Sequence, residues 1–223
     1  MSIPVIEVIN DVALKMGDPG FTQITTDEYL RWANQRSRKL STKLNLVKWV
    51  AFTDLEQDNE LYAEPDDCLQ ITRLSYSPTP TDARTFRDLH PYFADEFRAR
   101  VNWTYPVGEP DSYFPDQGFF YLVGRPTASL AQALKIEYWG LPEDMTSAST
   151  DTIPFMAKMR DLLADGIEID ALWKLEKREE SMAAGKVWEA TIGSVRPKLE
   201  NPATDRRSSV RVSRVSARMW RQV

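Results

Sequence analysis

The C-terminal end of the chain constrains its fold most, because it cannot join a hydrophobic core. Residues 205–223 carry six arginines against one acid, Asp205, so this segment has a net charge of +5. The rest of the chain has a net charge of −10, so the whole chain has a net charge of −5. The few valines of the segment are interleaved with serine and arginine and bury too little apolar area to offset ordering entropy. We therefore expect residues 205–223 to be a basic extension that is disordered until bound.

The remaining sequence is typical of a helix pair, a set of strands and a second helix pair. Residues 1–46 predict the first pair, with one helix over 3–15 and another that begins at a capping box formed by Thr25 and Glu28. Residues 47–145 predict a β-rich middle. Its strand patterns lie at 47–55, 60–65, 68–76, 118–126 and 133–142, with a turn at 77–82 and a short amphipathic helix at 92–103.

Residues 150–200 predict the second helix pair. Apolar residues step by four and three along a first helix face, and the second helix has its own stripe. The first face is Phe155, Met159, Leu162, Gly166, Ile169 and Trp173, and the second stripe is Trp188, Ile192, Val195 and Leu199. A charged corner at 174–180 separates the two helices. The predicted fold class is α+β, with a central antiparallel β-sheet between the helix pairs and an extended basic C-terminal tail. Residues 1–204 are expected to form a single domain.

The sequence offers little catalytic chemistry. One cysteine, Cys68, and one histidine, His90, leave no zinc site of the usual ligand types, and we expect no catalytic, cofactor or metal site. Cys68 is read as a small hydrophobe at a strand start, and His90 as a loop residue or minor cap. The carboxylate pairs Asp66/Asp67 and Glu179/Glu180 are better explained as turn residues and as a solvated helix face. Without a basic leader or a long apolar run, the chain is expected to be soluble, made in the cytoplasm and free of membrane contact.

The basic extension is the candidate binding site. Arginine without lysine favours bidentate contacts at protein interfaces, and a terminal methionine–tryptophan pair suits a partner pocket. The residues predicted to bind are Arg206, Arg207, Arg211, Arg214, Arg218, Met219, Trp220 and Arg221. The alternating segment VRVSRV could also add as a strand to the sheet edge of another chain. Binding to nucleic acid through phosphates, and a solvated tail with no partner, remain open alternatives.

Three segments together resemble phage head–tail adaptor proteins, also called connector or head-completion proteins. They are ITTDEYLRWANQRSRKL (24–40), PDDCLQITRLSY (65–76) and ALKIEYWGLPEDMTSASTDTIPFMAKMRDLLADGIEIDAL (133–172). The resemblance follows the order of segments over most of residues 1–200. It implies a structural protein of the virion neck, with no catalytic site, that docks on the portal as a ring, usually of twelve subunits. The segment 205–223 matches the C-terminal extension that reaches into the portal in such proteins. The insert 77–117 has no counterpart in the pattern.

The resemblance also implies the partners: the portal protein, neighbouring copies, a tail protein below, and DNA that passes without sequence recognition. An acidic body suits such a conduit, because it repels phosphate. The first alternative is a tail completion or tail-tube-end protein of the virion. A glycan-cleaving enzyme that uses paired acids and a nucleic-acid binder that uses the arginine tail are further alternatives.

Overall fold

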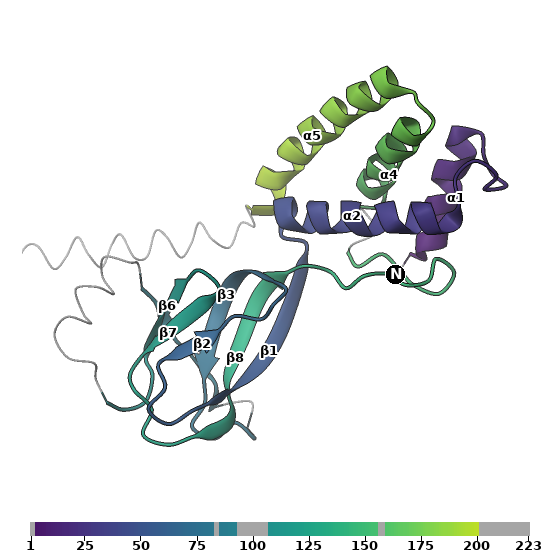
Figure 1. The fold of residues 1–223 in the computed structure, drawn as a ribbon. Helices are drawn as coiled ribbons and strands as arrows, with labels where there is room; N and C mark the ends of the chain where they lie inside the picture. The colour runs from purple at the N-terminus through teal and green to yellow at the C-terminus, as the bar shows by residue number, and fades with distance from the viewer. Residues whose placement is uncertain (1–2, 83–84, 93–106, 156–158, 201–223) are drawn as a thin grey trace, which may run out of the picture. The chain divides into compact units, whose positions relative to one another are not determined.

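The described part of the chain divides into a helical unit and a β-unit inserted within it. A computed structural model describes residues 3–82, 85–92, 107–155 and 159–200 (Figure 1). The helical unit comprises Met1–Leu44 and Asp144–Val223, and the β-unit comprises Asn45–Glu143. The α+β class is confirmed, with one helix pair before the strands and one after them along the chain. The expectation that residues 1–204 behave as one domain stays a prediction.

The helical unit is built around α4 (Arg160–Lys174). This helix packs against α1 (Val5–Met16), α2 (Thr26–Leu44) and α5 (Arg178–Glu200), and Figure 1 shows it between α1 and α5. Each helix buries one apolar stripe, as the 3.6-residue period requires. In chain order, the β-unit is inserted between α2 and α4. The unit is therefore assembled from two distant segments of sequence.

The end predicted for the first helix and the start predicted for the second helix are confirmed. Gly17 adopts a left-handed φ of 77° and ends α1, where its N–H reaches back to the last turn. At the start of α2, the Thr25 N–H donates to Glu28 Oε2 at 3.1 Å, and the Glu28 N–H donates to Thr25 Oγ1 at 3.3 Å. This reciprocal pair is the predicted capping box.

The C-terminal helix pair departs from the sequence prediction in two places. The helix expected from Phe155 begins at Arg160, and residues 156–158 lie outside the described ones. Its predicted apolar face is wrong at the far end, because Trp173 is 56% exposed while Ile167 is fully buried. The buried face of α4 lies to one side of the predicted stripe and includes Leu163, Ile167 and Ala171. The charged corner is also shorter than expected, since Arg178, Glu179 and Glu180 already form the first turn of α5.

The predicted β-rich middle forms two four-stranded sheets rather than one central sheet. The first has the order β1-β8-β3-β4 and the second the order β2-β7-β6-β5. The strands are β1 (Val47–Leu55), β2 (Leu61–Ala63), β3 (Cys68–Tyr76), β4 (Arg87–Asp88), β5 (His90–Pro91), β6 (Ser112–Asp116), β7 (Phe119–Val123) and β8 (Leu130–Gly140). All pairings are antiparallel except β5 with β6. The helix expected at 92–103 falls almost wholly outside the described residues.

The core of the β-unit joins the two sheets. Leu134, Ile136 and Tyr138 alternate along β8 and are buried together with Phe120 and Leu122 of β7. The Phe120 ring stacks on Tyr62 of β2, with centroids 5.6 Å apart. This alternation is what a sheet packed on one face requires. The strands β4, β5 and β6 were not predicted, because two are only two residues long and β6 contains Pro115.

Candidate interaction surfaces

The predicted binding residues of the basic extension all lie in 201–223, outside the described residues. They are Arg206, Arg207, Arg211, Arg214, Arg218, Met219, Trp220 and Arg221. Their role therefore stays a prediction from sequence. The described residues form further candidate surfaces: a polar hollow on α2, an exposed tryptophan and a unit with surplus acids.

The acids considered for catalysis lie in ordinary structural surroundings. The Tyr138 hydroxyl donates to Asp67 Oδ1 at 2.9 Å, which ties the 66–67 turn to β8. Glu179 and Glu180 are exposed in the first turn of α5, where the helix dipole favours acids. His90 lies exposed in β5, with its ring edge-on to Tyr92. Within the described ranges, no group of three or more metal-ligating side chains is found.

Cys68 starts β3, as predicted, and is half-buried. Burial raises the pKa of the Cys68 thiol to about 12, helped by the nearby carboxylates of Glu64 and Asp67. A thiol with so high a pKa is almost wholly protonated at neutral pH and is a poor nucleophile. Cys68 therefore acts as a small packing residue.

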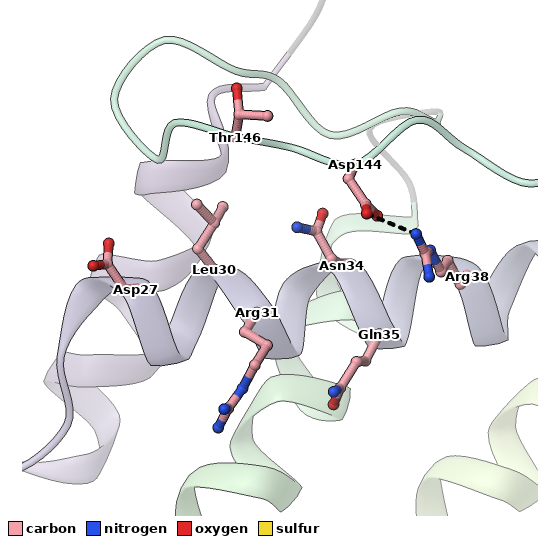
Figure 2. A pocket seen from close by; sticks show the side chains of 8 residues that line it. All are labelled: Asp27, Leu30, Arg31, Asn34, Gln35, Arg38, Asp144 and Thr146. Carbon is pink, nitrogen blue, oxygen red and sulfur yellow. Dashed lines mark hydrogen bonds and ion pairs between the residues drawn. The ribbon is translucent and has the colours of Figure 1, made fainter.

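A polar hollow lies on α2 beneath the segment 144–146 (Figure 2). Its volume is about 540 Å³, and its walls are mostly charged or amide side chains. The lining residues are Asp27, Leu30, Arg31, Asn34, Gln35, Arg38, Asp144 and Thr146. Small-molecule sites are mostly apolar, so this hollow is better suited to a polar segment of a partner chain.

The side chain of Asn34 holds the wall of the hollow in place. Its amide nitrogen donates to the Met145 carbonyl at 2.8 Å, and its amide oxygen accepts from the Met145 N–H at 2.9 Å. Arg38 forms an ion pair with Asp144 at 2.6 Å. In Figure 2, Arg31 and Gln35 point away from the 144–146 segment. Of the two arginines that line the hollow, Arg38 is thus occupied by Asp144, and Arg31 extends from the exposed face of α2.

The carboxylate of Asp151 holds the next part of the same segment in place through hydrogen bonds. It accepts the N–H groups of Thr146 and Ser147 at 2.6 and 2.9 Å. These backbone hydrogen bonds, the Ser147 bond first, lower the pKa of Asp151. The segment from Glu143 to Thr152 contains no regular helix or strand and is held by such side-chain contacts. Asn34 and Asp151 both lie in segments that carry the family resemblance. Sequence reasoning still missed this clamp, because a local pattern does not show which distant residues these side chains contact.

The tryptophans of the described residues range from buried to exposed. Trp32 and Trp188 are buried, while Trp49 and Trp139 are half-buried in the β-unit. Trp173 is 56% exposed, with the Arg178 guanidinium 5.5 Å from its ring centroid. Exposed aromatic rings beside arginine are typical of contact surfaces between proteins. Trp103 and Trp220 lie outside the described residues.

The two units differ in net charge. By sequence, the β-unit holds sixteen acids and eight bases, so it accounts for −8 of the −10 outside the basic extension. Seven of these acids fall in residues 54–67, a stretch without a single base. The helical unit without the extension is close to neutral. A surplus of one sign on one unit acts on charged partners rather than on the fold.

The chain belongs to the SU10 adaptor protein family, whose model matches residues 3–215. This is a family of phage head–tail adaptors, so the chain is a structural adaptor protein of a bacteriophage. No curated protein matches the chain. None of the described helices is long and apolar enough to cross a membrane.

Proposed function

We propose that this adaptor docks on the portal as a ring, connects it to the tail and lines the channel through which DNA leaves the head. The observation that carries the proposal is the extent of the family match, which runs through both units and continues to residue 215. The match therefore includes most of the basic extension as well as the folded body. The protein acts through binding alone, without catalysis, within the neck of the virion.

The distribution of charge supports the two tasks. The basic extension, with its arginines and the terminal pair Met219 and Trp220, is the arm that enters the portal. The acidic body faces DNA without holding it, since like charges repel along the channel. A ring needs a heterologous interface that closes on itself, and we expect twelve copies to close it.

Co-assembly with the portal tests the proposal directly. Purified full-length protein is mixed with the portal from the same phage, and the mass of the complex is measured. The expected result is one discrete ring-on-ring mass, which disappears when residues 205–223 are deleted. Circular dichroism of the truncated protein confirms that the body is still folded.

A matched pair of full-length variants distinguishes the contribution of the arginines to docking from that of Met219 and Trp220. One variant replaces the six arginines of the extension by serine, and the other changes Met219 and Trp220 to alanine. Loss of docking in both is expected. Failure of the wild-type protein to bind the portal, together with binding to a tail protein, would instead establish the tail completion reading.

A further inference from the structure

The four outer edges of the two sheets are very unequal. Three of them are short: β4 and β5 have two residues each, and β2 has three. Short edge strands are one way in which proteins prevent unwanted pairing between sheets. The fourth edge, β1, has nine residues, Val47–Leu55, without proline or glycine. Among the residues that the structure describes, only β8 pairs with β1.

The solvent-facing side of β1 is apolar in its middle. Val50 is 50% exposed and Phe52 is 52% exposed, although both belong to regular strand structure. The two charges of the strand lie near its ends, where Lys48 pairs with Glu137 at 2.7 Å and Asp54 accepts the Gln132 N–H at 2.7 Å. A long edge strand with an apolar middle is a template for another strand.

We propose that residues 208–214 of a neighbouring copy add to β1 as an antiparallel strand. This inference rests on the proposed ring, in which copies of the chain lie side by side. In the segment SSVRVSR, Val210 and Val212 share one face of an extended strand, while Arg211 and Ser213 share the other. The valines match the apolar pair Val50 and Phe52 on β1. Cross-strand pairs of this type stabilise a sheet by about 0.2–1 kcal/mol each.

Charge complementarity supports the antiparallel direction. The C-terminal end of β1 and the chain that follows it carry Asp54, Glu56 and Asp58, which are all exposed. An antiparallel strand brings its own beginning to that end of β1, so Arg206 and Arg207 meet these acids. The pairing leaves residues 216–223 free. That remainder holds Met219 and Trp220, the pair proposed to enter the portal, so one arm has a segment for each partner.

Disulfide scanning tests the inference on the full-length protein without the portal. In a Cys68→Ser background, one preparation carries Val50→Cys and the other a single cysteine at one position from 208 to 214. The two are mixed under mild oxidation, and the covalent dimer is quantified. The expected yield alternates with a period of two along 208–214, as strand pairing requires. Val187→Cys, on the exposed face of α5, replaces Val50→Cys as the control and gives no alternation.

A second variant keeps the test independent of cysteine chemistry. Lysine at both Val50 and Phe52 repels the arginines and removes the apolar contacts. The change also removes the edge-on contact of Phe52 with Phe86, so circular dichroism checks that the variant keeps its fold. We expect self-association to weaken by roughly tenfold, while Val187→Lys leaves it unchanged.

Two outcomes overturn the inference: no dimer at any position, or a yield without alternation. Because the dimer is measured without the portal, a failure to dock on the portal does not affect this result.

Discussion

The helical unit and the β-unit use their charged side chains in different ways. In the helical unit, ion pairs join separate helices: Arg36 binds Asp170 through two hydrogen bonds, of 2.7 and 2.5 Å, and Lys39 and Lys43 both reach Glu189. In the β-unit, acids outnumber bases two to one. Ion pairs such as Lys48–Glu137 and Arg87–Glu109 also form in the β-unit. Its surplus of eight acids nevertheless gives the β-unit a negative field that the nearly neutral helical unit lacks.

Core truncations give the largest effects and test whether the two units unfold together. Ile167 of α4 and Phe120 of β7 are both fully buried. Ile167→Ala should lower the free energy of unfolding by about 2–5 kcal/mol and Phe120→Ala by about 3–5 kcal/mol, because each leaves a cavity. If residues 1–204 are one domain, both changes shift a single denaturant transition followed by tryptophan fluorescence and circular dichroism. Two transitions, each shifted by only one change, would contradict the single-domain prediction.

The same glycine substitution should have opposite signs in the two units. Gly124 of the β-unit has a φ of +113°, and an added Cβ would lie 2.7 Å from the Glu109 carbonyl oxygen. Gly124→Ala should therefore cost about 1–3 kcal/mol. Gly193 lies in α5 with nothing within 4 Å of an added Cβ, so Gly193→Ala should stabilise by about 0.5–1 kcal/mol. Thermal melts of both variants measure the contrast, and a destabilised Gly193→Ala would indicate a packing role for that glycine.

Two acids with equally low pKa values give the smallest and most specific effects. Hydrogen bonds from the Thr22 hydroxyl, and from the N–H groups of Gln23, Thr22 and Ile24, hold the pKa of Asp18 at about 2. Hydrogen bonds from Lys135 and Lys48 hold the pKa of Glu137 at about 2. Each carboxylate stabilises the fold above its unfolded pKa, near 4, and this stabilisation is lost as the pH falls towards 2.

The two acids differ in their response to salt. Asp18→Asn and Glu137→Gln should both lower the melting temperature at pH 7, by an amount that shrinks below pH 4. Added salt should reduce the Glu137→Gln effect more, because its partners are lysines, while the partners of Asp18 are N–H and hydroxyl groups. Melting curves at low and high salt decide this, and equal salt dependence would count against the lysine pair as the source of stability.

Sequence patterns predicted the fold best where the local signal was strong. The capping box placed the start of α2, and alternation placed β1, β3 and β8 close to their observed bounds. The split into two sheets could not be predicted, because it depends on which strands pair across the core. The short strands β4 and β5 carry too few residues for any period to be visible.

The candidate site was predictable only in part. Arginine-rich composition marks the extension from sequence alone, and its residues remain a prediction. The clamp between Asn34 and Met145 joins positions 111 residues apart, so no local pattern announces it. The exposed edge of β1 is likewise a property of pairing, since alternation can place Val50 and Phe52 on one face of the strand but cannot show that the strand lies at the edge of its sheet.

The pairing of β1 with β8 has a consequence for how such chains diversify. Val47, near the entry to the β-unit, is paired with Gly140, near its exit. Paired residues of antiparallel strands lie only about 5 Å apart. The gap that the helical unit must bridge is therefore set by this one ladder and does not grow with the number of residues beyond it. Loops between β1 and β8 can therefore lengthen or shorten without changing the span between the two ends of the β-unit.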